Sequence, residues 1–341
     1  MCSKRLLRTF NVIGDGVYVG ERDGALSVLS SDGERHSYPI GILDGIAFHG
    51  SQSVSTDALA LFCENGKRVS VFSRGGRHVC SVVGGNVGNV ELRRCQWQRY
   101  FDSELRVSMA RQFVLAKVIN QRRNVVRFER NHRSDFLRSG ISELRSFEES
   151  VMGVVTLSSL IEVEARAART YWRCFGEMVR REGWWNGGRT KRPPLDAANA
   201  LLSYLYTIFT NDVAGCLRSV GFDSQCGYLH EVRSGRDSLA CDVVEEFRGS
   251  IVDPFVLRII NRKQLSVSRD FEVRGLQYFV TSDGKRKLFR LLDEYRCKIV
   301  RHSGIRDDVQ VGELPLLQAR LLSRHVRGED SEYRPFILSL S

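Results

Sequence analysis

A cluster of glycines near position 85 separates two stretches of sequence with different hydrophobic periods. Gly84, Gly85 and Gly88 fall within five residues, and glycines so closely spaced interrupt helices and strands. Before them, apolar residues form short runs typical of strands. After them, apolar residues recur every three or four positions, as in amphipathic helices. We therefore predict an α+β protein with a β-rich N-terminal domain over residues 1–88 and a larger all-α catalytic domain over residues 89–341.

The β-rich stretch carries turn signals but no catalytic constellation. Asp32-Gly33 and Gly75-Gly76 are expected hairpin turns, because glycine readily adopts the positive φ of tight turns. We expect a strand over 42–48 and a helix over 56–64 that stops at Gly66. Two roles stay open for this region: a plain scaffold, or a scaffold that also pairs with a second subunit and presents basic loops.

A histidine precedes a short acidic helix in the second half of the chain. Asp237 or Ser238 is expected to cap the helix, whose apolar residues repeat every four positions. Asp242 and Glu245 are three residues apart, so their carboxylates project from one face. Such carboxylates repel unless a cation or proton lies between them. Together with His230, and without a thiolate at ligand spacing, they favour Mg²⁺ or Mn²⁺. The alternative is a solvated acidic face beside an ordinary loop histidine.

Another acid lies where an apolar side chain is expected. In the predicted helix over 157–178, positions 157, 160, 161, 168, 171, 175 and 178 form one apolar stripe, and Glu164 lies in the middle of it. A carboxylate directed at a core is costly unless it is paired or protonated. Either an arginine satisfies Glu164, or Glu164 is a third metal ligand that arrives from a different helix.

A basic, aromatic loop follows this helix. Trp184 and Trp185 precede Arg189, Lys191 and Arg192. The cations could meet phosphates while the indoles stack on bases, which would make the loop a DNA contact. The alternative is that the indoles pack beneath the loop.

Two further polar residues are candidates for site support. Asn199 shares an apolar helix face with Leu202 and Tyr206. It either orients the metal site or the scissile phosphate, or is a core amide with satisfied hydrogen bonds. Arg248, just after the acidic pair, is a candidate for DNA binding or site support.

The charge of the chain fits a polyanionic partner. Lys and Arg outnumber Asp and Glu by 51 to 40, for a net charge of +11, and arginine binds phosphate bidentately. Charge alone also serves solubility. No apolar run approaches the roughly 20 residues of a membrane span. Nine cysteines without a C-x-x-C pair are typical of reduced thiols in a cytoplasmic protein.

Four blocks of sequence together match one pattern. Residues 164–172 (EARAARTYW) correspond to Glu-Gly-x-Ala-Ala-x-x-Tyr-aromatic, and residues 191–204 (KRPPLDAANALLSY) to Arg-Arg-Pro-Pro-x-Asp-x-x-Asn-Ala-Leu-Leu-Ser. Residues 227–230 (GYLH) correspond to Gly-Phe-Leu-His, and residues 242–264 to Asp-Leu-x-Glu-Glu-Phe-Arg and Ile-Asn-Arg-Lys-Gln. In order and spacing the chain resembles the CRISPR-associated integrases of spacer acquisition, the Cas-one family, and within it the type I-C form. Ala165 replaces the usual glycine, which a helix tolerates.

The resemblance implies a function and a site. Glu164, His230 and Glu245 would be the metal ligands, with Asp242 supporting or sharing the site and Mg²⁺ or Mn²⁺ as the ion. The implied enzyme is a metal-dependent DNA endonuclease and integrase that inserts spacer DNA into a CRISPR array, by attack of a 3′-hydroxyl on a phosphodiester. The implied partners are double-stranded DNA (prespacer and repeat), a second copy of the chain, and the small Cas-two protein in a heterohexamer-like complex.

Two other functions remain open on the residues alone. One is a metal-dependent DNA nuclease that acts in repair or processing without integration. The other is a DNA-binding scaffold whose acids form a structural ion pair. All metal-dependent readings require Glu164 to come within a side chain's reach of His230 and Glu245.

Overall fold

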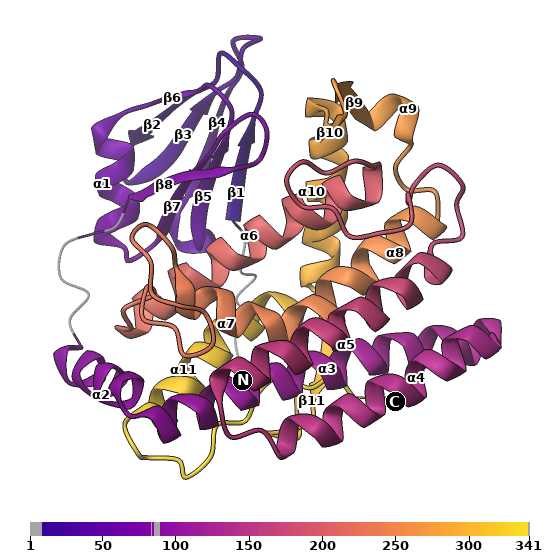
Figure 1. Ribbon diagram of the computed structural model, residues 1–341. Helices are drawn as coiled ribbons and strands as arrows, with labels where there is room; N and C mark the ends of the chain where they lie inside the picture. Colours follow the sequence, from indigo (N-terminus) through magenta and orange to yellow (C-terminus); the bar gives the residue numbers. More distant parts are fainter. Residues whose placement is uncertain (1–8, 83, 85–88, 340–341) are drawn as a thin grey trace.

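The computed structural model describes residues 9–82, 84 and 89–339, and passes from a β-rich region into a larger helical part (Figure 1). Residues 85–88 of the predicted boundary loop, and residue 83 before it, lie outside the described residues, so the division at 88 stays a prediction. Within the described ranges no helix combines the length and apolar character of a membrane span. The cysteines of the same ranges are all free.

Two four-stranded sheets and one helix make up the β-rich region. One sheet has the order β1-β5-β7-β8 and the other the order β4-β3-β2-β6. The strands are β1 Thr9–Ile13, β2 Tyr18–Arg22, β3 Ala25–Leu29, β4 Arg35–Pro39, β5 Gly45–His49, β6 Ser53–Val54, β7 Arg68–Phe72 and β8 His78–Val82. Apolar side chains such as Val19, Ile46 and Phe62 form a core shared by the sheets and helix α1.

The predicted helix over 56–64 is confirmed as α1, Thr56–Glu64, with Gly66 beyond its end at φ +63°. The predicted strand over 42–48 begins later, as β5, because residues 40–42 form a 3₁₀ turn. β5 is buried along its whole length, since parallel strands pair with it on both sides.

The helical part surrounds one long helix, α3. Its helices are α2 Val90–Phe101, α3 Ser103–His132, α4 Asp135–Met152, α5 Leu157–Met178, α6 Ala197–Val220, α7 Ser238–Phe247, α8 Asp253–Asn261, α9 Val267–Asp270, α10 Ser282–Arg296 and α11 Leu314–Val326. Helix α3 contacts α4, α5 and α7. Two hairpins are added to this helical body: β9 Phe271–Arg274 with β10 Gln277–Val280, and β11 Ile299–His302 with β12 Asp307–Gln310.

Helix α6 joins the two regions. Arg68 of β7 donates to Asp212 Oδ1 of α6 at 2.9 Å. The Tyr204 hydroxyl of α6 lies 3.0 Å from Nδ1 of His49 on β5. Burial, and secondarily the Lys285 charge, lower the pKa of His49 to about 3, so this contact joins neutral groups. Polar contacts of this kind fix the β-rich region against the helix whose other face lies near the candidate site.

Candidate metal and nucleic-acid site

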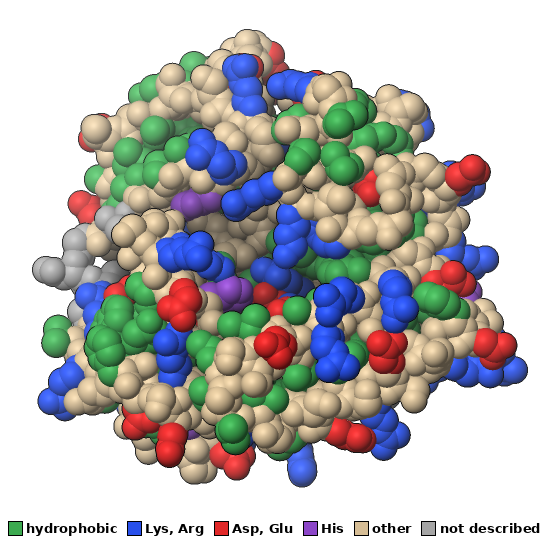
Figure 2. All heavy atoms as spheres, in the orientation of Figure 1, with side chains coloured by type: hydrophobic (Ala, Val, Ile, Leu, Met, Phe, Trp, Pro, Cys, Tyr) green, Lys and Arg blue, Asp and Glu red, His purple; other side chains and the backbone are tan. Residues whose placement is uncertain are grey.

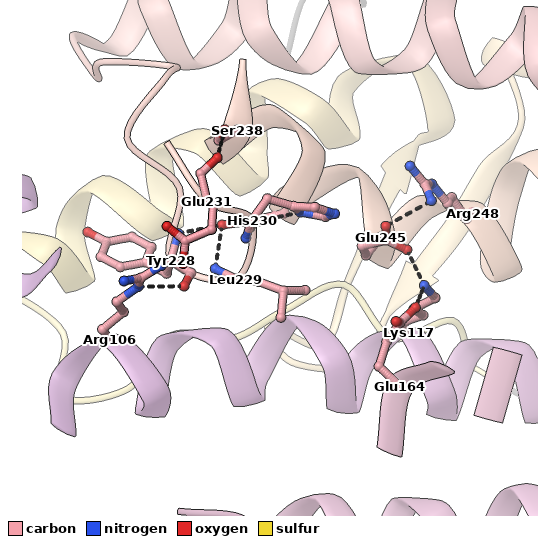
Figure 3. Close-up of polar contacts among 11 residues, drawn as sticks. Arg106, Lys117, Glu164, Tyr228, Leu229, His230, Glu231, Ser238, Glu245 and Arg248 are labelled. Atoms are coloured by element: carbon pink, nitrogen blue, oxygen red, sulfur yellow. Dashed lines mark hydrogen bonds and ion pairs between the residues drawn. The ribbon is translucent and has the colours of Figure 1, made fainter. Parts of the chain in front are cut away.

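Three helices bring a lysine and two glutamates together. Lys117 of α3 places its ammonium 2.8 Å from Glu245 Oε2 of α7, and it also donates to Glu164 Oε1 of α5 (Figure 3). The Lys117 side chain is 8% exposed and that of Glu245 is 3% exposed, whereas that of Glu164 is 24% exposed. Glu164 and Glu245, which follow Lys117 by 47 and 128 positions in the sequence, therefore converge on one positive charge.

Glu245 is held in its ionised form by the cations around it. Burial alone would raise its pKa, but Arg248, Lys117 and His230 lower it to about 2. Arg248 contributes a 2.8 Å contact from NH1 to Glu245 Oε1. Because electrostatic effects of this size require short distances, the His230 ring must also lie near Glu245.

His230 is oriented by Asp242. The carboxylate of Asp242 is fully buried and accepts hydrogen bonds from the backbone N–H groups of Tyr228, Leu229 and His230. His230 Nδ1 lies 2.7 Å from Asp242 Oδ1. A carboxylate only accepts, so Nδ1 carries the proton and Nε2 keeps its lone pair. Of the two predicted roles for Asp242, these contacts favour supporting the site.

The predicted cap of α7 by a side chain is wrong. Asp237 occupies the N-cap position but its side chain makes no cap hydrogen bond. It instead accepts from Ser224 and Arg218, and Ser238 donates to the Glu231 carbonyl. These contacts fasten the loop that carries His230, so the polar side chains serve the loop rather than the helix end.

A π-helical turn, Arg248–Val252, follows α7 and brings Arg248 to the site. Gly249 permits the close approach of this turn to α3, because a Cβ there would lie 2.8 Å from the backbone nitrogen of Gln121. The Arg248 guanidinium lies 4.8 Å from the centre of the Tyr206 ring. Behind it, buried Asp253 accepts from the Tyr171 hydroxyl at 2.7 Å and from the Tyr206 hydroxyl. Arg248 is thus held from two sides, which favours site support over DNA binding.

The basic loop is organised by Asn199. This buried amide accepts from Arg189 NH1 and from the Thr190 N–H, and donates to the Gly188 carbonyl and to Asp196. Arg189 also donates to Ser203. Asn199 therefore matches the core-amide interpretation, and Arg189 supports the site's surroundings.

Among the other loop residues, Lys191 and Arg192 are exposed and stay predicted DNA contacts. Trp184 is buried against Phe271, and Trp185 packs on Phe175. The indoles thus pack beneath the loop, as the alternative interpretation held.

Lys and Arg side chains gather around a recess in the face shown in Figure 2. Partial desolvation, and then the charges of Arg248, Lys117 and Arg189, lower the pKa of Lys191, so these three cations lie near Lys191. A polyanion entering the recess would meet positive charge first.

The fit of a divalent cation is partial as the side chains stand. In the described residues no group of three or more His, Cys, Asp or Glu is arranged to hold a metal ion; the Lys117 ammonium occupies the space between the two glutamates. Two observations fit a cation. Glu164 and Glu245 already converge on one positive charge. Glu245 Oε2 is buried and faces the Lys117 ammonium at 2.8 Å, a contact that a metal ion would replace. The carboxylates of Glu164 and Glu245 and Nε2 of His230 would hold such an ion.

Sequence reasoning missed Lys117. The signal was present, because Lys117 lies four residues after buried Phe113 and four before Gln121 on the core face of α3. A polar residue on an apolar face was the argument used for Glu164, and it applies equally to this lysine.

Comparisons with known proteins agree with one another. The family model described as CRISPR associated protein Cas1 matches residues 10–294. A CRISPR-associated endonuclease from Chlorobaculum tepidum is 32% identical over 345 residues, covering 98% of this chain and 99% of the relative. The fold is similar to a casposase bound to an integration product (TM-score 0.81, 22% identity, 96% of this chain and 92% of that chain). It is also similar to a chain of a Cas6-RT-Cas1–Cas2 complex (TM-score 0.81, 23% identity, 98% of this chain and 36% of that chain).

Proposed function

The chain belongs to the CRISPR-associated Cas1 family, and we propose that it is a divalent-metal-dependent DNA endonuclease and integrase of spacer acquisition. The observation that carries the proposal is the convergence of Glu164 and Glu245, from α5 and α7, on a single positive charge beside the oriented ring of His230. Oxygen ligands with one imidazole suit Mg²⁺ or Mn²⁺.

The chemistry that such an ion supplies when bound is neutralisation of the phosphate charge and polarisation of a phosphoryl oxygen. The chain's own residues do the rest. Asp242 fixes the tautomer and direction of His230. Arg248 keeps Glu245 ionised, while exposed Lys191 and Arg192 receive backbone phosphates. Attack by a DNA 3′-hydroxyl gives strand transfer and joins spacer DNA to a CRISPR array, whereas attack by water gives hydrolysis.

The proposed substrates are prespacer and repeat duplexes, and the proposed assembly is a homodimer bridged by the small Cas2 protein in a heterohexamer-like complex in the cytoplasm. The proposal is supported by the fold likeness to a casposase bound to an integration product and to a chain of a complex that contains Cas2. The net charge of +11 fits a DNA partner.

Two competing functions each have an observation in their favour. A nuclease without integration is favoured by the curated relatives, which are described as endonucleases. A DNA-binding scaffold is favoured by the Lys117 ion pairs, because such pairs could be structural.

One assay separates the three functions. A labelled donor duplex with free 3′ ends is incubated with supercoiled plasmid, Mn²⁺ and the Cas2 partner, and products are resolved on denaturing gels. Joined product supports the integrase, plasmid or donor cleavage without joining supports the nuclease, and retention of DNA without either supports the scaffold. Glu164→Ala should abolish joining while DNA retention in a gel shift stays near that of the wild type. If retention falls as far as joining, Glu164 serves folding instead.

A further inference from the structure

The Lys117 ammonium lies where the proposed cation would lie. It approaches one oxygen of Glu245 at 2.8 Å and hydrogen-bonds one oxygen of Glu164. Like-charged carboxylates this near one another need a counter-ion, and an ammonium and a divalent metal ion both meet that need. The lysine and a metal ion therefore compete for the same position.

The site is charge-balanced without a metal ion. Two ionised glutamates face two cations, Lys117 and Arg248. A divalent ion added to this set would leave two uncompensated positive charges in a largely buried place, which is unfavourable at low local dielectric. Metal binding thus requires the ammonium to leave its position, or an anion to arrive with the metal. Backbone phosphates of DNA are such anions.

The two cations differ in where they lie relative to the glutamates. Arg248 is ion-paired to Glu245 and also lies over the Tyr206 ring at 4.8 Å. Lys117 contacts both glutamates, at 2.8 Å from Glu245 Oε2 and through a hydrogen bond to Glu164 Oε1, so it occupies the position that an ion shared by the two carboxylates would take. Lys117 is consequently the cation that a metal ion can displace.

We propose that Lys117 is an internal counter-ion that keeps the metal affinity of the DNA-free protein low and couples metal binding to DNA binding. On metal entry its ammonium turns from the glutamates to a phosphate oxygen of the bound DNA. No covalent bond changes in this step. This inference rests on the proposed function, because it assumes that the glutamates bind a divalent ion.

The test measures Mn²⁺ affinity by calorimetry for the full chain, alone and saturated with a 3′-dideoxy duplex. Lys117→Met should bind Mn²⁺ at least about 10-fold more tightly than the wild type without DNA, within the usual range of coupling between sites. DNA should tighten Mn²⁺ binding more in the wild type than in Lys117→Met, so the difference between the two proteins shrinks. Lys117→Arg, which keeps the charge, should bind Mn²⁺ no more tightly than the wild type.

Lys285 supplies the matched control. It is equally buried, at 6% exposure, but its ammonium donates to the Arg74 carbonyl rather than to carboxylates. Lys285→Met should leave Mn²⁺ affinity unchanged, and an equal gain in both methionine variants would overturn the proposal. If Lys117→Met unfolds without metal, Mn²⁺ should restore its melting transition, and failure to do so also overturns the proposal.

The outcomes separate this inference from the function beneath it. Equal Mn²⁺ affinity in the wild type and Lys117→Met refutes the counter-ion role alone. Absence of Mn²⁺ binding in every variant, with and without DNA, refutes the metal-dependent function as well.

Discussion

Glu245 and Glu246 are neighbours on α7 that face opposite surroundings. Both are buried, and burial alone would raise the pKa of each. Arg248 and Lys117 outweigh burial at Glu245 and lower its pKa to about 2. At Glu246 burial prevails, and the pKa rises to about 7. The groups that hydrogen-bond Glu246 are neutral donors: the Tyr333 hydroxyl, the Gln318 amide and the Phe336 N–H.

The comparison shows that burial does not set the charge of an acid by itself. The charge of the groups that face the acid decides whether it is ionised. The same difference in neighbours gives the two faces of α7 different roles. The face of α7 that carries Glu245 meets cations and a histidine. The face that carries Glu246 holds the C-terminal segment, because Tyr333 and Phe336 both bond to it.

The largest effect expected from this contrast is on catalysis. Glu245→Gln should lower DNA joining and cleavage at least about 1,000-fold, because a neutral amide is a poor metal ligand and the ion's stabilisation amounts to several kcal/mol. Glu246→Gln should stay within about threefold of the wild type. Both variants are assayed with the labelled donor and plasmid in Mn²⁺, with circular dichroism as the folding control. Comparable losses in the two variants would mean that the faces do not divide function from structure.

The next effect concerns folding. Glu246→Ala should lower the free energy of unfolding by about 4 kcal/mol, since it leaves buried donors of Tyr333, Gln318 and Phe336 unsatisfied and opens a cavity. Urea unfolding of this variant and the wild type at pH 7 measures the difference. Limited proteolysis should cut the C-terminal segment sooner in the variant. A loss below about 1 kcal/mol would show that the segment is held by its apolar contacts alone.

The sequence could predict a site residue where a polar side chain interrupts an otherwise apolar helix face. Glu164 stood out because it is an acid on an otherwise apolar helix face. Away from the site, the predicted helix over 56–64 is observed with the expected bounds. Lys117 carried the same signal on α3. A lysine is easily taken for a side chain whose stem is buried and whose charge reaches water, and so this residue was missed.

Other contacts leave no periodic trace in the sequence. The C-terminal segment docks largely through backbone groups: the Phe336 N–H bonds to Glu246, and the Phe336 carbonyl accepts from Asn120. Backbone donors and acceptors are the same for every residue type except proline, so composition cannot reveal them. The missing side-chain cap at Asp237 also leaves no periodic trace, because its partners are Ser224, at the start of the same α6–α7 connection, and Arg218, near the end of α6.

A third prediction uses pH to separate the two glutamates. The folded pKa of Glu246, about 7, exceeds its ordinary value of 4.5. Between those pH values the folded chain binds more protons than the unfolded chain, so stability falls as pH rises, by up to about 3 kcal/mol from this residue. Burial also raises the pKa of Asp253 from 3.8 to about 6, so this residue changes stability with pH in the same direction. Glu245, with its lowered pKa, loses stability only as pH falls from 4.5 toward 2.

Urea midpoints at pH 5 and pH 7.5 measure this dependence. Glu246→Gln should reduce the fall in stability between the two pH values and leave the share that Asp253 contributes. An unchanged fall in Glu246→Gln would mean that Glu246 is ionised throughout this range, as Glu245 is.

The smallest expected effect concerns Asp242, which contacts the proposed metal ligand His230. Asp242→Asn keeps the size of the side chain but replaces one accepting oxygen with an NH2 donor, so it loses the hydrogen bonds either of the Tyr228 and Leu229 N–H groups or of His230. Loss of such an orienting carboxylate typically lowers metal affinity about 10-fold to 100-fold. Mn²⁺ calorimetry should therefore show weaker binding in Asp242→Asn, whereas Glu246→Gln, equally buried on the same helix, should bind as the wild type does. If Asp242→Asn binds Mn²⁺ normally, His230 reaches the site without help, and Asp242 only anchors the loop.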